Sequence, residues 1–172
     1  MEPLEQAKRP IMIVAGPYGH PLHPAAVAVP IGAWVASLVF DVGSHLAPDP
    51  GFLTPGSRWL IAIGILGALA AAVPGFLDLF GIPTGTPAFR TGLVHMSLNL
   101  AVTALYAVGF VWRAGDTGPV GAGQIALSAV SLAALGVSGY LGGMLAFRYG
   151  VRVANESTQL EGYRSTTSDK ET

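Results

Sequence analysis

The sequence predicts an all-α, polytopic membrane protein folded as an up-down four-transmembrane-helix bundle. Three observations predict this fold class. Of the 172 residues, 51% are hydrophobic and 11% are charged, whereas soluble domains carry roughly 25% charged residues. A helix needs about 20 apolar residues to cross the hydrocarbon core of a bilayer, and four windows of the chain are apolar over this length. The loops between these windows are short, and short loops force neighbouring helices to run antiparallel.

The four helices are expected at residues 24–45, 58–80, 91–112 and 123–148. The first begins at Pro24, which suits the first helical position because its missing N–H would be unpaired there anyway. Pro30 is expected to kink this helix. Clusters of Gly and Pro, which mark turns, separate the helices at 48–56, 81–87 and 115–119. Because the helices alternate in direction, helices one and three run parallel and lie on one diagonal of the bundle.

Three segments are predicted along the chain. Residues 1–22 form a cytoplasmic N-terminal segment, residues 23–149 the transmembrane domain, and residues 150–172 a polar cytoplasmic tail that we expect to be disordered. Basic residues at the helix ends predict this orientation, because an excess of Lys and Arg marks the cytoplasmic side. The side of the termini carries Lys8, Arg9, Arg90, Arg148 and Arg152, and the opposite side carries Arg58 and Arg113.

The composition excludes several kinds of function. Cysteine is absent, so this chain forms no disulfide, ligates no iron–sulfur cluster and uses no thiolate in catalysis. The net charge of −1 provides no basic surface for nucleic acid. The sequence contains no Ser–His–acid arrangement and no glycine-rich phosphate loop between a strand and a helix. No catalytic residue is therefore predicted, and whether the protein is an enzyme stays open.

Ionisable side chains inside the predicted spans are candidates for function, because a charge in lipid is costly. Residues spaced by 4, 7, 11 or 18 share a helical face, and polar faces should point into the bundle. The shared faces hold His23, Pro30, Trp34, Asp41 and His45 on helix one, Gly67, Ala71, Pro74 and Asp78 on helix two, and His95, Asn99 and Tyr106 on helix three. Trp34 and Tyr106 are expected to be packing residues.

These faces predict a polar cluster at the cytoplasmic end of the bundle. Its members are His20, His23, Asp78, His95 and Asn99, with Arg90 nearby. At the opposite end, Asp41 and His45 are four residues apart and are expected to form a hydrogen bond. Helix four has a small-residue face at Gly136, Gly139 and Gly143, which permits close approach of another helix.

A b-type haem is one interpretation of the cytoplasmic cluster. His23 and His95, on facing helices at similar depth, would ligate the iron from both sides, since helix bundles build such sites from inward residues. Asn99 or Asp78 would orient the second nitrogen of a ligand ring. Arg90 or Arg148 would meet the propionates.

Three other interpretations stay open. A divalent metal such as zinc or iron would take His20, His23, Asp78 and His95 as ligands. A structural hydrogen-bond network would have Asp78 accept from a His or from Asn99 and so lock the helices together. A proton or ion pathway is the third, although the middle of the bundle offers few polar groups for a relay.

Several stretches of the chain resemble the bacterial membrane-protein family catalogued as domain of unknown function 2231. They are residues 19–24, 30–32, 40–41, 75–78, 82–83 and 139–151, with Arg90, His95 and Asn99. The resemblance covers residues 19–153, and Met144 and Arg152 depart from the residues expected there. It implies a four-helix protein of the bacterial inner (plasma) membrane without an established activity. Some relatives are fused to Rieske-type iron–sulfur domains, which implies membrane electron transfer and favours haem.

The sequence and the resemblance together predict a redox-associated membrane subunit. It would hold haem or a metal between helices one and three near the cytoplasmic face. The protein would be embedded in the lipid bilayer and would associate with a larger membrane complex or a redox partner. The alternative is a non-enzymatic membrane subunit or scaffold. In that case the His, Asp and Asn cluster is a structural hydrogen-bond network, and helix four provides the contact with other subunits.

The predicted orientation has a direct test. A reporter that is active only outside the cytoplasm, fused after Thr172, should be inactive, because both termini are expected on the positive side. A reporter that is active only inside the cytoplasm should work at the same position. The reverse pattern would invert the topology and place the His cluster at the outer face.

Overall fold

The computed structural model describes residues 2–164, and over this range the chain is all-helical. Its elements are α1 (Pro3–Lys8), the 3-10 turn η1 (Ile13–Ala15), α2 (Leu22–Ala26), α3 (Ala28–Gly43), α4 (Leu53–Gly81), α5 (Pro87–Trp112), α6 (Ala122–Gly143), the π-helical turn η2 (Met144–Arg148) and α7 (Glu156–Glu161). Four segments within it are long and apolar enough to cross a membrane: Leu22–Gly43, Leu53–Gly81, Pro87–Trp112 and Ala122–Arg148. This confirms the predicted fold class.

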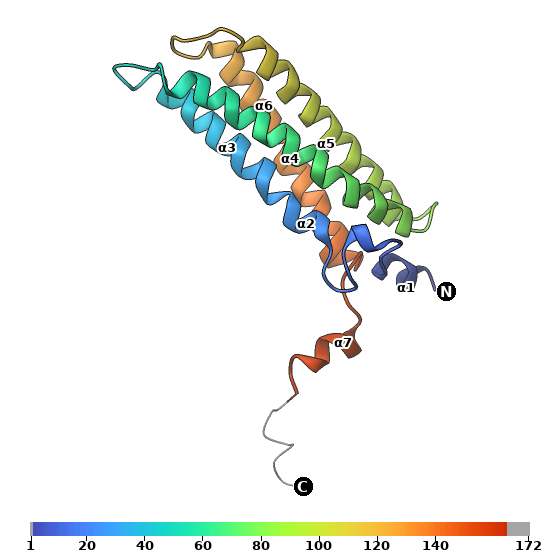
Figure 1. Cartoon of the computed structure of the whole chain (residues 1–172). Helices are drawn as coiled ribbons and strands as arrows, with labels where there is room; N and C mark the ends of the chain where they lie inside the picture. Colours follow the sequence, from blue (N-terminus) through green and yellow to red (C-terminus); the bar gives the residue numbers. More distant parts are fainter. Residues whose placement is uncertain (1, 165–172) are drawn as a thin grey trace, which may run out of the picture.

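The four long helices form two hairpins that pack side by side (Figure 1). α3 packs against α4 and α5 against α6, while the hairpins meet through α4 with α5 and α3 with α6. Within the described residues, the backbone of α3 does not closely approach that of α5, and the backbone of α4 does not closely approach that of α6. Helices one and three are therefore diagonal, as predicted. We call the end with α1, α2 and α7 the terminus end, and the end with loops 44–52 and 113–121 the far end.

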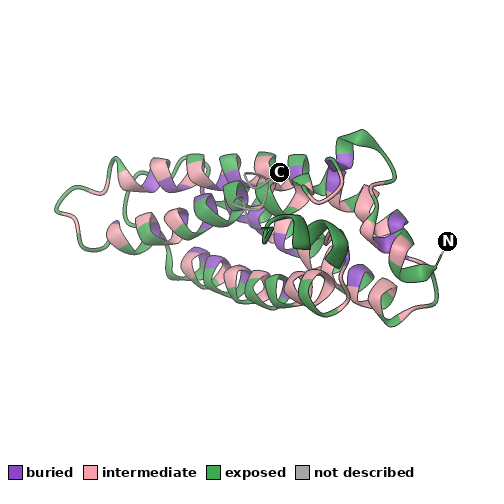
Figure 2. Cartoon of the chain, turned by 90° about the horizontal axis from the view of Figure 1, so that it is seen from below, coloured by how far each residue is buried: buried purple, intermediate pink, exposed green. Residues whose placement is uncertain are grey.

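Exposed residues cover the outside of this bundle and buried residues lie between its helices (Figure 2). Many of the exposed residues are apolar. Val39, Leu66 and Val130 are each more than 60% exposed on the outer faces. Buried positions instead include several hydroxyl side chains: Ser37, Ser57, Ser128, Ser131 and Ser138. A bilayer explains this distribution, because lipid solvates apolar surface while polar groups need partners within the protein.

Prolines determine how the first span begins. Pro30 has no N–H to donate to the carbonyl of Ala26, and α2 ends at Ala26. The boundary between α2 and α3 therefore lies where this hydrogen bond is missing. The expected kink thus takes the form of a break at Val27 between α2 and α3. α5 begins with a regular helix cap instead. The hydroxyl of its N-cap residue Thr86 accepts a hydrogen bond from Phe89 N (3.1 Å), and Pro87 is the first helical residue.

The middle of the bundle is filled by an aromatic pair. The rings of Trp34 and Tyr106 stack with centroids 4.2 Å apart and planes 6° from parallel. Ile61 and Val102 complete this buried cluster. The predicted packing role of both aromatics is confirmed. Their approach depends on Gly64 in α4, where a Cβ atom would overlap the indole ring of Trp34.

This dependence predicts different outcomes for two identical substitutions. Gly64→Ala should destabilise the folded bundle by about 1–3 kcal/mol, because the added methyl group overpacks the core. Gly136→Ala has open space around its Cβ position and should be neutral or stabilising by up to about 1 kcal/mol. Thermal or denaturant unfolding in detergent measures both. Equal stabilities would show that Gly64 is not a packing constraint.

Candidate functional site

Two imidazole rings face each other inside the terminus end of the bundle. His23 comes from α2 and His95 from α5, which are parts of the two diagonal spans. Their ring centroids are 6.0 Å apart and their planes are nearly perpendicular, at 88°. The structure therefore brings together the two residues that the sequence pairs at equal depth.

Each imidazole is anchored by the helix next to it in its own hairpin. Nδ1 of His23 donates a hydrogen bond to the carbonyl of Ala71 in α4 (2.8 Å), and Nδ1 of His95 donates to the carbonyl of Ser138 in α6 (2.8 Å). Backbone carbonyls, rather than the predicted Asn99 or Asp78, thus orient the two rings. In a neutral imidazole, a proton held on Nδ1 leaves Nε2 with a lone pair.

A glycine makes room for each of these rings. A Cβ atom on Gly75 would lie 2.6 Å from Nδ1 of His23, and one on Gly142 would lie 3.1 Å from Cε1 of His95. Each glycine is four residues after the carbonyl that holds the same ring. Both rings are therefore pressed against helix backbone that carries no side chain at the point of contact.

Asn99 and Ser138 add side-chain contacts around His95. Asn99 Nδ2 lies 2.8 Å from Ser138 Oγ, 2.9 Å from the carbonyl of His95 and 3.2 Å from His95 Nε2. An amide nitrogen has two hydrogens, so the two shorter contacts use both of them. The lone pair on Nε2 of His95 is then not committed to Asn99.

Asp78 has a different partner from the one predicted. It forms an ion pair with Arg152 (Nε to Oδ1, 2.8 Å), and both side chains are largely buried. Arg152 Nη2 also donates to the carbonyls of Ala15 and Gly16, each at 2.9 Å. The expectation that Asp78 accepts from a His or from Asn99 is wrong, because a guanidinium from the returning C-terminal segment occupies that position.

The remaining predicted site residues are exposed. His20 and Arg90 are exposed at the terminus end. Over residues 2–164, no group of three or more His, Asp or Glu side chains is placed to hold a metal ion. The structure thus does not gather the four predicted metal ligands, His20, His23, Asp78 and His95, into one cluster.

The chain after helix four also folds back onto the bundle. Val151 packs against Ala7 and Ile82, and Arg152 N donates to the carbonyl of Ala7 (3.0 Å). Helix α7 follows. Of the tail predicted at 150–172, residues 150–164 thus have described structure, and residues 165–172 lie outside the described range.

A second buried constellation at the far end was missed by the sequence analysis. Arg113 Nη2 lies 2.6 Å from Asp41 Oδ2, and neither side chain is exposed. Ser57 donates to the other carboxylate oxygen, and Arg113 also reaches Ser128 Oγ (3.0 Å). The expected Asp41–His45 hydrogen bond is wrong, since His45 instead contacts the carbonyl of Val120 (2.7 Å).

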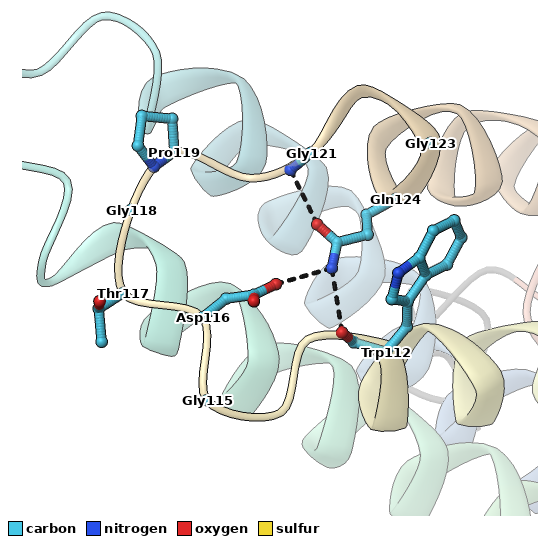
Figure 3. Close-up of a pocket in the computed structure, with 9 residues that line it drawn as sticks. All are labelled: Trp112, Gly115, Asp116, Thr117, Gly118, Pro119, Gly121, Gly123 and Gln124. Carbon is cyan, nitrogen blue, oxygen red and sulfur yellow. Dashed lines mark hydrogen bonds between the residues drawn. The ribbon is translucent and has the colours of Figure 1, made fainter.

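Gln124 closes the far end above this ion pair. Its Nε2 donates to Asp116 Oδ2 (2.7 Å) and to the carbonyl of Trp112 (3.2 Å), while its Oε1 accepts from Gly121 N (2.8 Å). Figure 3 shows these bonds across the open pocket formed by the 113–121 loop. The amide thereby satisfies the start of α6 and fixes the loop that follows Arg113.

The two constellations and the aromatic pair follow one internal symmetry. Residues 23, 34 and 41 on helix one and residues 95, 106 and 113 on helix three have the same spacing, 11 positions and then 7. Their partners on helices two and four also correspond, at a constant offset of 67: Ala71 with Ser138, Ile61 with Ser128, and Gly75 with Gly142. This repeated spacing is the signal that would have found Arg113, although the residues at equivalent positions differ.

Comparison with protein families gives a match that covers most of the chain. Residues 19–155 match the family described as "Predicted membrane protein (DUF2231)". The matched range contains both imidazoles, the aromatic pair and both buried ion pairs. No curated protein and no solved structure matches the chain.

The far-end ion pair predicts a strong asymmetry between single and double substitutions. Asp41→Asn should cost about 3–5 kcal/mol of folding free energy, because it leaves the Arg113 guanidinium buried without its counter-charge. Asp41→Leu combined with Arg113→Met should recover most of this loss, since apolar side chains of similar volume replace a buried pair at little cost. Unfolding in mixed detergent measures both. A double variant as unstable as Asp41→Asn would contradict this account.

Proposed function

We propose that this chain, which belongs to the DUF2231 family of predicted membrane proteins, is a redox-associated membrane subunit. In this proposal His23 and His95 hold a b-type haem between the two diagonal helices. The haem would supply one-electron chemistry, and the protein would exchange electrons with a redox partner or a larger membrane complex. The site would lie near the cytoplasmic face of a bacterial inner membrane, as the distribution of Lys and Arg indicates.

The single observation that carries this proposal is the placement of the two imidazoles. Ring nitrogens bind metal ions at about 2 Å, so two rings on opposite sides of one ion have centres about 6 Å apart. The observed centroid distance is 6.0 Å. The two rings come from diagonal helices, so they approach from opposite sides of the bundle axis, and in this proposal they would hold the haem iron between them.

The number of available ligands favours haem over a bare metal ion. A zinc site takes at least three protein ligands, whereas haem iron needs only axial ligands because the porphyrin provides the others. In the described residues no third His, Asp or Glu joins the imidazoles. Asp78, a predicted metal ligand, is already paired with Arg152.

The surrounding groups would tune the two ligands. A metal-bound imidazole usually donates its other N–H to a carbonyl or a carboxylate, which fixes its orientation and raises its basicity. His23 and His95 both have such a carbonyl at 2.8 Å. Asn99 would steady His95, and Arg90 would provide a positive charge for the propionates at the membrane surface.

A second function is favoured by a different observation. Each imidazole, and Asn99, already has hydrogen-bond partners on its own or a neighbouring helix. A protein whose polar core serves only to lock helices together needs no more than this. The alternative proposal is therefore a non-enzymatic membrane subunit or scaffold.

Absorption spectroscopy separates the two proposals. Protein purified from membranes should show a Soret band that shifts on reduction, and His23→Ala and His95→Ala should each abolish the six-coordinate spectrum. His20→Ala and His45→Ala are matched controls, because both residues are exposed, and they should retain the band. If the protein expressed with added haem precursor is colourless, metal-free and stable, the haem proposal is wrong and the scaffold proposal is supported.

A further inference from the structure

A short apolar run at the terminus end is only partly covered by the described chain. Ile11, Met12, Ile13 and Val14 are 46%, 56%, 88% and 51% exposed, and they follow one another directly. Four consecutive exposed apolar residues are unfavourable in water. The next residue, Ala15, is completely buried, so the run ends where the chain enters the protein.

This run is fixed against the end of a membrane-spanning helix. Ile11 Cγ2 and the carbonyl of Arg9 each lie 3.7 Å from the Cβ position of Gly81, the last residue of α4. On the outer face of α4, Phe76 and Phe80 are 49% and 61% exposed, with ring centroids 4.7 Å apart. The run therefore begins beside the residue at which this membrane-spanning helix ends.

Other contacts hold the run in place from its far side. The guanidinium of Arg152 donates to the carbonyls of Ala15 and Gly16 and is itself paired with Asp78 near the end of α4. The segment is thus part of the folded protein, and its exposed side chains are presented in a fixed position.

The charge next to this run is positive. Lys8 and Arg9 precede it, with Pro10 between, and residues 6–16 contain no Asp or Glu, while Glu2 and Glu5 lie earlier in the same segment. The stem of Lys8 lies along Gly150 (3.7 Å from its Cβ position), and Arg9 is exposed. An apolar run beside a pair of cations matches the boundary between acyl chains and anionic headgroups.

We propose that residues 8–14 form an in-plane anchor for anionic phospholipid. Ile11–Val14 enter the acyl boundary of the leaflet at the terminus end, and Lys8 and Arg9 contact phosphate groups of its anionic lipids. The occupant is the bilayer because the exposed apolar run begins beside the last residue of a membrane-spanning helix and has two cations next to it. This interaction does not depend on the proposed haem.

Site-directed spin labelling tests the proposal cleanly, because the full chain has no cysteine. Ile13→Cys and Tyr163→Cys place a nitroxide at two positions of equal exposure, 88% and 87%. The purified protein is reconstituted into bilayers of phosphatidylcholine alone or with phosphatidylglycerol. Collisions with oxygen report the apolar phase, and collisions with a water-soluble nickel complex report the aqueous phase.

We expect the label at position 13 to collide with oxygen and to be protected from nickel, with the reverse at position 163. Phosphatidylglycerol should deepen the immersion at position 13, and both high salt and Arg9→Gln should remove this effect because they screen or delete the charge. Arg164→Gln, which removes an exposed cation from the C-terminal segment, should leave it unchanged. A label at 13 as accessible to nickel as the label at 163, or an immersion indifferent to lipid charge, would overturn the proposal.

Discussion

Lipid offers no hydrogen-bond partner, so every polar side chain inside this bundle must find its partner on another part of the chain. That constraint explains the arrangement of the whole interior. The carboxylate of Asp41 meets the guanidinium of Arg113, and each imidazole meets a backbone carbonyl of a neighbouring helix. Because these partners lie on different helices, the polar groups fix the depth and rotation of each helix, which nonspecific apolar contacts with lipid leave free.

Glycine is what allows the polar groups to reach those partners. His23 approaches α4 closely enough for a hydrogen bond only because Gly75 has no side chain, and Gly64 plays the same part for the indole of Trp34. The polar groups can therefore pair only where glycine lets the helices approach closely. The outer surface of α6 differs, since Gly136 and Gly139 contact nothing there, and the small-residue face that the sequence predicts points away from the bundle interior.

The helices were predictable from the sequence because long apolar windows and turn residues are local signals. The facing of His23 and His95 was also predictable, since it follows from helical periodicity and from parallel direction. Asp41 and Arg113 were not paired, because Arg113 follows the last residue of α5 and looks like an ordinary interfacial cation. Asp78 and Arg152 are 74 positions apart, and their contact depends on the path of a segment beyond the last span, where no periodic pattern exists.

The repeated spacing of the two hairpins has a consequence for how the protein is made. The first hairpin, α3 with α4, carries the buried Asp41, and the second, α5 with α6, carries the buried Arg113, which directly follows α5. While the chain is being inserted, the first hairpin enters the membrane with a carboxylate whose counter-charge has not yet been synthesised. The ion pair can therefore form only after Arg113 has been added, and the attraction between opposite charges in a medium of low dielectric then holds the two halves together. The order of synthesis makes the second half of the chain the completing partner of the first.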